Sequence, residues 1–364
     1  MPYLMTSAPR PPKTPGLKGR AAISNPGSRY DVLQRETIDD GWFQAEDSTA
    51  VKRVHIRRET VKQIISQNTS PDVPFERSIN PYRGCEHGCI YCFARPSHAY
   101  LNLSPGLDFE TKITVKHNAA QQLEQQFQAP RYQCKPIMIG ANTDPYQPIE
   151  RQYQLTRALL NRFNTFKHPC SITTKSALIE RDIDLLSQLA SQQLVHVYLT
   201  FTTLNPKLSR LLEPRVTAPQ RRIQTITQLR EAGIPVSVLI APIIPVLTDH
   251  EIESLLEQVA QAGAQQAEAI LLRLPREVAP LFTEWLTQHY PDKADHVLNQ
   301  IRDTRAGQLN NSDYQQRNIG LGARASMIQQ RFQLAKRRYQ LNQALPPHNC
   351  DIFQAFPKQL SLFD

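Results

Sequence analysis

The chain of 364 residues has few cysteines and no long hydrophobic run. No stretch approaches the roughly 18 apolar residues that a membrane helix needs. The first twenty residues contain no apolar segment of signal-peptide length either. These absences predict a soluble, cytoplasmic protein with no membrane partner. In a reducing cytosol its six cysteines would not form a disulfide framework.

Glycine-rich phosphate loops are also missing. Neither a G-x-G-x-x-G segment nor a Walker-type loop follows any of the strand-like stretches. The sequence therefore lacks the main signal for a dinucleotide or P-loop nucleotide site.

Positive charge is in excess. The formal net charge is +9 and the pI is near 9.3. A basic balance is compatible with a polyanionic partner such as nucleic acid, and equally with a solvated basic surface. Basic runs with an aromatic neighbour, "KRVHIRR" and "RFQLAKRRYQ", lie on both sides of the central region.

The order of segments predicts a main domain with appendages. Residues 1–70 show no sustained helical or strand period and are interpreted as a basic N-terminal arm. Residues 71–290 form the main domain, residues 291–350 a helical C-terminal extension, and residues 351–364 a tail.

The main domain alternates strand-like and helical segments, which predicts an α/β fold with a parallel sheet. Such units build either an open doubly wound sheet or part of a barrel. Polar residues follow nearly every strand-like segment, as in barrels whose sites gather at the carboxyl ends of the strands. We therefore expect a partial (β/α)6 barrel. Its expected strands lie at 76–83, 136–142, 171–176, 195–204, 236–245 and 269–275, and its helices at 148–163, 177–192, 219–233 and 249–263.

Three of the six cysteines lie within "GCEHGCIYC". Cys85, Cys89 and Cys92 have the spacing C-x3-C-x2-C, so one loop can direct three thiolates at one object. A [4Fe-4S] cluster held by three cysteines keeps one iron with an open position. The alternative is a closed Cys3His zinc site completed by His87 or His98. The remaining cysteines, Cys134, Cys170 and Cys350, are scattered and are interpreted as small core residues.

This spacing, with Tyr91 before the third cysteine, resembles the signature of the radical S-adenosylmethionine (radical SAM) enzymes. The resemblance implies a partial (β/α)6 barrel, a [4Fe-4S] cluster and S-adenosylmethionine bound to the open iron. It also implies that one electron, from a reductant such as ferredoxin or flavodoxin, cleaves the cofactor to a 5'-deoxyadenosyl radical.

From about Ile79 to Ala264 the chain most resembles the spore photoproduct lyase branch, including the phrase "SINPYRGCEHGCIYCFARPSHAYL". The resemblance implies cofactor contacts at the strand ends. The methionyl amine would face Thr143 and Asp144, the carboxylate or ribose Lys175, the ribose Thr202 and Thr203, and the carboxylate Arg222.

One departure concerns the return of hydrogen to the product radical. The lyases carry a cysteine after the second strand, whereas this chain has Ala141 and Asn142 there. Tyr146 is the nearby candidate hydrogen donor.

Near the end of the sequence, Gln359 to Phe363 read QLSLF, which resembles the pentapeptide that binds the bacterial sliding clamp. Gln359, Leu360, Leu362 and Phe363 would enter the groove of the clamp. The alternative is a terminal segment packed on the domain.

The sequence thus predicts a radical SAM enzyme acting on nucleic acid, related to a repair lyase. Two alternatives remain open. One is the same chemistry on a protein or small molecule, and the other is a non-enzymatic, zinc-binding, DNA-associated module.

Overall fold

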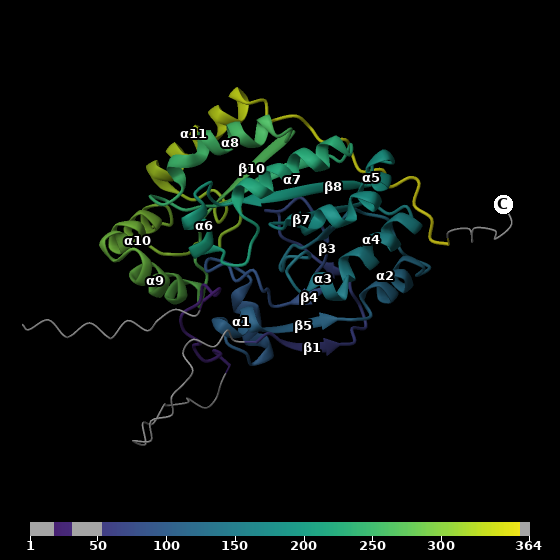
Figure 1. Ribbon diagram of the computed structural model, residues 1–364, viewed down its shortest axis with the longest axis horizontal. Helices are drawn as coiled ribbons and strands as arrows, with labels where there is room; N and C mark the ends of the chain where they lie inside the picture. The colour runs from purple at the N-terminus through teal and green to yellow at the C-terminus, as the bar shows by residue number, and fades with distance from the viewer. Residues whose placement is uncertain (1–17, 31–52, 357–364) are drawn as a thin grey trace, which may run out of the picture.

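The protein is described here from a computed structural model, whose described residues are 18–30 and 53–356 (Figure 1). The clamp-like residues Gln359, Leu360, Leu362 and Phe363 lie outside them. Helices cover the outer side of a curved sheet, and a smaller sheet lies below it in this view.

The main sheet is a partial barrel of six parallel strands with one antiparallel strand at its edge. The order along the sheet is β10-β9-β8-β7-β6-β3-β2. The parallel strands are neighbours in the order in which they occur in the chain. A doubly wound sheet would reverse direction at a switch point, so the expected barrel topology is confirmed. Its strands are β2 (Ser66–Gln67), β3 (Arg77–Ile79), β6 (Ile137–Ile139), β7 (Cys170–Thr174), β8 (Val195–Phe201), β9 (Val236–Ile243) and β10 (Gln266–Leu271).

Amphipathic helices pack on the outer face of these strands. The largest hydrophobic core lies between the two layers and includes Ile172, Val197, Phe201 and Leu229, all fully buried. β-Branched strand residues against one apolar helix stripe are the expected composition of such a layer. The helices are α2 (Ala119–Phe127), α3 (Glu150–Tyr153), α4 (Leu155–Thr165), η2 (Ala177–Asp182), α5 (Ile183–Ser191), α7 (Pro219–Glu231), η3 (Asp249–Glu251) and α8 (Ile252–Gln261).

A second sheet has the order β1-β5-β4. It comprises β1 (His55–Glu59), β4 (Tyr82–Arg83) and β5 (Lys112–Lys116), and β1 pairs with β5 in parallel. The sequence analysis placed residues 55–59 in an arm without strands, which is wrong for this stretch. The reason is that β1 reads HIRRE and is largely exposed, so it carries no apolar alternation.

The remaining elements surround the mouth of the barrel and its C-terminal side. A second hydrophobic core joins the cysteine loop, at Cys89 and Ile90, to α9 and α10 around the buried Trp285. These elements are η1 (Arg95–Leu101), α1 (Leu107–Thr111), α6 (Pro206–Leu212), α9 (Val278–His289), η4 (Pro291–Lys293), α10 (Ala294–Asp303) and α11 (Gly322–Arg338).

The segment after α11 crosses the N-terminal ends of β7 and β8. His196 Nε2 donates to the Pro346 carbonyl at 2.8 Å, and the His348 ring stacks on His196 with centroids 3.9 Å apart. The last described part of the chain therefore closes the barrel end opposite the cysteine loop. None of the helices among the described residues has the length and apolar character needed to cross a membrane.

Candidate functional site

The cysteine loop follows β4 and brings three thiols together at the barrel mouth. Cys85 and Cys89 are buried and Cys92 is partly exposed. Burial raises the pKa of all three thiols, and the charges of Cys89 and Cys92 raise the pKa of Cys85 further. All three thiols thus lie on one loop in a largely buried environment. A set of thiolates in this environment needs a cationic group between them, which is what an iron–sulfur cluster provides.

Arg95 fixes the shape of this loop. Its side chain is fully buried, and it donates to the carbonyl oxygens of Cys89 at 2.9 Å and Gly88 at 2.8 Å. Its Nη2 also pairs with Glu110 Oε1 at 2.6 Å, where neither side chain is exposed. A guanidinium with several donors in one plane suits several acceptors of a tight loop at once. Arg95 lies within the phrase "SINPYRGCEHGCIYCFARPSHAYL", but no role was predicted for this residue.

Residues 18–30 lie over the loop, next to α1 (Figure 1). The backbone N–H groups of Ala21 and Ala22 donate to the Glu110 carboxylate at 3.3 and 3.0 Å. Arg20 Nη1 donates to the Glu110 carbonyl at 2.8 Å. Part of the predicted arm thus belongs to the site, because the carboxylate that holds Arg95 also holds this segment.

Glu213 is the meeting point of a second buried network. Its carboxylate pairs with Lys175 Nζ at 3.1 Å and Arg222 Nη2 at 3.0 Å. Tyr91 and Thr202 donate to it as well, Thr202 at 2.9 Å. Burial alone would raise the pKa of Glu213, but the charges of Lys175 and Arg222 outweigh that effect and lower the pKa to about 2. The carboxylate is therefore charged.

This network joins predicted cofactor residues to the cysteine loop. Lys175 Nζ lies 5.7 Å from the Tyr91 ring centroid and 3.2 Å from the Ala241 carbonyl oxygen. The Lys175 side chain is 14% exposed, whereas Glu213 has no exposed side-chain area. The ammonium group is thus held by Glu213, on a side chain that is still partly exposed.

Arg222 occupies a different position from Lys175. It is fully buried, and its Nη1 donates to the Thr200 carbonyl at 2.6 Å while Nη2 holds Glu213. Its observed contacts support Glu213. A direct contact with the cofactor carboxylate stays a prediction.

Asp144 and Thr143 follow β6, as expected. Asp144 accepts from Thr174 Oγ1 at 2.6 Å and from the Lys175 backbone N–H at 2.8 Å, and His87 Nδ1 lies 3.2 Å from it. Burial would raise the pKa of Asp144, but His87 and these hydrogen bonds hold it below its usual range. Thr143 donates its hydroxyl to the Tyr82 carbonyl at 2.9 Å, so it fixes the loop backbone.

Two further predicted residues are fully buried. Thr203 donates to Glu251 at 2.7 Å. The Tyr146 hydroxyl donates to Asp182 at 3.1 Å. Their predicted roles, ribose binding and hydrogen donation, are not tested by these contacts.

The two histidines considered for a zinc site have protein partners. His87 faces Asp144, and His98 Nε2 donates to the Lys112 carbonyl at 3.1 Å. Within residues 18–30 and 53–356, no three His, Cys, Asp or Glu side chains are grouped to hold a single metal ion.

Of the other cysteines, Cys170 is a buried core residue, as expected. Cys134 and Cys350 were also expected to be small core residues, but both are only partly buried. The two side chains lie near each other: burial raises the pKa of Cys134, and the neighbouring Cys350 raises it further. The chain brings them together because the C-terminal segment crosses the barrel end beside the start of β6.

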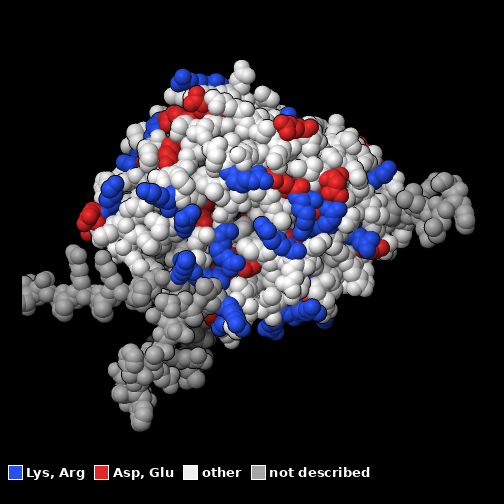
Figure 2. Space-filling view, viewed as in Figure 1, with Lys and Arg blue, Asp and Glu red and all other residues white. Residues whose placement is uncertain are grey.

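A cavity of about 340 Å³ lies directly beside the cysteine loop. His87 and Tyr146 line it together with the hydroxyl-bearing Ser176 and Thr217, and Arg151 and Arg215 supply positive charge. In Figure 2, lysine and arginine side chains gather across the middle of the face between α1 and α7. Arg215 pairs with Glu86 at 2.9 Å. Partial burial, and then the charge of Arg215, lower the pKa of the neighbouring Arg20.

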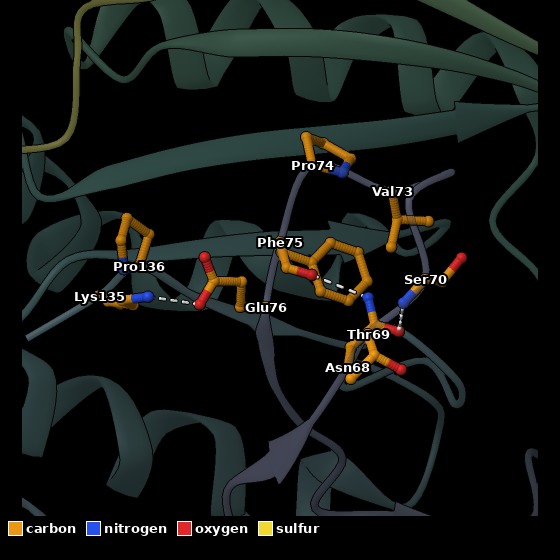
Figure 3. A pocket seen from close by; sticks show the side chains of 9 residues that line it. All are labelled: Asn68, Thr69, Ser70, Val73, Pro74, Phe75, Glu76, Lys135 and Pro136. Atoms are coloured by element: carbon orange, nitrogen blue, oxygen red, sulfur yellow. Dashed lines mark hydrogen bonds and ion pairs between the residues drawn. The ribbon is translucent and has the colours of Figure 1, made fainter.

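A larger cavity of about 560 Å³ lies at the other end of the barrel (Figure 3). It is lined by residues 68–70, 73–76, 135 and 136, which precede β3 and β6. The ion pair between Lys135 and Glu76, at 2.6 Å, borders it. Because barrel enzymes react at the carboxyl ends of their strands, we assign the chemistry to the smaller cavity beside the loop.

The barrel region of the chain is similar to known proteins. The profile of the radical SAM superfamily matches residues 79–259. An uncharacterized protein of Mycobacterium tuberculosis is 38% identical over 222 residues, which cover 60% of this chain and 65% of that protein. The chain thus spans less than two thirds of that relative's length. A Radical SAM Nalpha-GlyT isomerase of Pseudomonas phage M6 is 24% identical over 62% of this chain and 46% of the isomerase.

Among solved structures, the fold is similar to spore photoproduct lyase complexed with dinucleoside spore photoproduct. The TM-score is 0.57 at 12% sequence identity, covering 78% of this chain and 79% of that chain. At this identity the likeness concerns the fold.

Proposed function

Because the chain belongs to the radical SAM superfamily, we propose that Cys85, Cys89 and Cys92 hold a [4Fe-4S] cluster and that the enzyme acts on nucleic acid. The donor set fits the cluster, since one loop carries three mostly buried thiols at the spacing C-x3-C-x2-C. Once bound, the cluster would supply the one-electron reductive cleavage of S-adenosylmethionine, whose product is a 5'-deoxyadenosyl radical.

The protein's own residues bind and orient in this proposal. Lys175 offers an ammonium group for the cofactor carboxylate or ribose on a side chain that is 14% exposed, and Glu213 holds it in place. Asp144 anchors the strand-end loops through Thr174 and the Lys175 backbone. Direct cofactor contacts by Thr143, Thr202, Thr203 and Arg222 remain part of the proposal.

The main observation in support of a nucleic-acid substrate is the cavity of about 340 Å³ beside the cysteine loop. Arg151 is exposed at this cavity and Arg215 is half-buried. Guanidinium groups bind phosphates with good geometry, and a base removed from its stack needs an enclosed space beside the reacting group. The basic face in Figure 2 extends this environment.

The names of the similar proteins support the same substrate class. Spore photoproduct lyase has been solved with a dinucleoside photoproduct, and the phage relative is named as an isomerase of Nalpha-GlyT. These names describe those proteins. For this chain we propose a base or nucleotide lesion as the substrate, in a reaction related to that of a repair lyase.

The test measures 5'-deoxyadenosine formation by the reconstituted enzyme with dithionite, with and without oligonucleotides. We expect ultraviolet-irradiated or modified oligonucleotides to raise the rate. Arg151→Ala is expected to raise the oligonucleotide KM several-fold, because one phosphate contact is lost. Arg162→Ala, on α4, where the arginine pairs with Glu124, is the matched control. Stimulation by peptides or small metabolites instead of oligonucleotides would contradict the proposal.

Delivery to DNA through the sliding clamp is a further part of the proposal, and it rests on the sequence of Gln359 to Phe363 alone. A double variant, Leu362→Ala with Phe363→Ala, is expected to abolish binding to the purified clamp while deoxyadenosine formation is unchanged. Clamp binding that survives this change would remove the assignment. The electron donor is proposed to be a ferredoxin or flavodoxin.

A further inference from the structure

Three aromatic side chains are exposed near the cysteine loop. Phe93 directly follows Cys92 and is 51% exposed, while Tyr100 in η1 is 67% exposed and Tyr30 is 48% exposed. The rings of Tyr30 and Tyr100 lie 5.5 Å apart at an angle of 33°. Single exposed aromatics are common on protein surfaces, but a group of them usually marks a binding site.

Each of these rings has an arginine against it. Arg273 Cζ lies 5.6 Å from the centroid of Phe93. Arg29 Cζ lies 4.9 Å from the centroid of Tyr30 and 5.3 Å from that of Tyr100. Arg276 is exposed and, after Tyr30 and Arg29, is one of the neighbours that lower the pKa of Tyr100. Glu277 pairs with Arg29 at 2.6 Å.

The surface is held in place by contacts with the cysteine loop region. Ser28 donates to the Ala99 carbonyl at 3.1 Å, and Arg29 Nη2 donates to the Pro96 carbonyl at 3.4 Å. Both acceptors belong to η1, which begins three residues after Cys92. Arg273 and Arg276 lie in the segment that follows β10, at the mouth end of the barrel. The aromatic residues are thus presented at the edge of the mouth by fixed elements.

We propose that Tyr30, Phe93 and Tyr100, with Arg29, Arg273 and Arg276, form a stacking surface for single-stranded nucleic acid. It would hold the unpaired nucleotides that flank the one entering the mouth. Aromatic faces stack on bases of any sequence, and adjacent guanidinium groups neutralise the phosphates between them. The surface has three arginines and one acidic partner for them, so its net charge is positive. A protein partner would favour a continuous apolar patch, whereas here each ring adjoins a charge.

This inference rests on the proposed nucleic-acid substrate and adds that the substrate is bound in an unpaired form. It predicts that the protein binds a single-stranded 12-nucleotide DNA more tightly than the matching duplex. The difference arises because bases within a duplex do not offer their faces to the rings.

The test uses fluorescence anisotropy with the full, cluster-loaded chain and labelled DNA or RNA 12-mers. Tyr100→Ala is expected to weaken single-strand binding by about 5- to 150-fold, the range for loss of one stacked base. Arg276→Ala is expected to weaken it less and to reduce its dependence on salt. Tyr314→Ala is the matched control, because Tyr314 is 56% exposed with Arg317 5.1 Å from its ring centroid, in the loop that packs on Ser70.

The outcomes separate this inference from the proposed function. Unchanged single-strand binding in Tyr100→Ala, while oligonucleotides still stimulate deoxyadenosine formation, would overturn the stacking surface alone. Equal binding of single strand and duplex would overturn it too. If no nucleic acid either binds or stimulates the enzyme, both proposals fail. Comparing the DNA and RNA 12-mers identifies which of the two the surface prefers.

Discussion

At the scale of single residues, Glu213 carries the charge balance of the site. Two cations, Lys175 and Arg222, face one carboxylate whose side chain has no exposed area. Removing one partner from a buried ion pair leaves the other charged and unpaired, which is far more costly than removing a pair at the surface. The network that places Lys175 therefore depends on this one side chain.

Glu213→Gln is expected to destabilise the folded chain by about 3–5 kcal/mol. It is also expected to weaken S-adenosylmethionine binding, because Lys175 is no longer held. Glu180→Gln is the matched control, since Glu180 pairs with the adjacent Arg221, which is 41% exposed, and its loss costs about 1 kcal/mol or less. Urea unfolding and cofactor titration measure both effects. A similar loss of unfolding free energy in the two variants would show that Glu213 contributes no more than a surface ion pair does.

Sequence reasoning found Lys175 and Arg222 but missed the carboxylate that joins them. Glu213 sits in the quoted segment "EPRVTAPQRRI", where nothing local distinguishes it from an exposed glutamate. Its partners come from β7 and α7 and from the cysteine loop, so only the fold brings them together. The same holds for Arg95 and Glu110. Charged residues beside a cysteine motif offer a weak signal of this kind of support.

At the scale of elements, the cysteine loop is shaped by its neighbours as much as by its own sequence. Gly88 has φ +66°, and a Cβ atom there would lie 2.8 Å from Glu110 Oε2. That carboxylate also holds Arg95 and the N–H groups of Ala21 and Ala22. A side chain at Gly88 would therefore displace the group that braces the loop.

Gly88→Ala is expected to cause loss of iron on purification while the chain stays folded. Gly233→Ala is the control, because Gly233 has φ +75° with nothing within 4 Å of an added Cβ. That change costs only the left-handed backbone conformation, about 1–2 kcal/mol. Iron analysis and far-ultraviolet circular dichroism distinguish the cases. Full iron retention in Gly88→Ala would contradict the role given to Glu110.

The parallel strands and four of the helices could be predicted because their periods are strong. Val195–Phe201 and Val236–Ile243 are apolar and rich in β-branched residues, and the helices between the strands have one apolar face. Strand β1 could not be predicted, since its charged residues form a strand only through pairing with β5. The approach of Cys134 to Cys350 could not be predicted either, because the two residues lie more than 200 positions apart in the sequence.

At the scale of the whole molecule, buried neutral histidines tie stability to pH. Burial lowers the pKa of His168 to about 3 and that of His348 to about 4, and it lowers the pKa of His196 as well. In the unfolded chain these rings take up protons near their usual pKa of 6.5. Since the unfolded state then binds more protons than the folded state, stability falls as the pH falls from about 6.5 toward 4.

We expect the urea midpoint of the protein to decrease between pH 7.5 and pH 5. His348→Gln should lower the midpoint at pH 7.5 but show a smaller decrease with acid, because one depressed pKa is removed. His250→Gln should keep the full decrease, since the His250 side chain is 66% exposed. An unchanged slope in His348→Gln would show that other groups cause the acid sensitivity.

The most direct test of the account is anaerobic purification followed by iron and zinc analysis and incubation with dithionite and S-adenosylmethionine. The account predicts a brown protein with about four irons per chain that forms 5'-deoxyadenosine. Cys89→Ala should lose both properties, while Cys170→Ala, in the hydrophobic core, should keep them. A colourless, zinc-loaded protein that forms no deoxyadenosine would contradict the central claim.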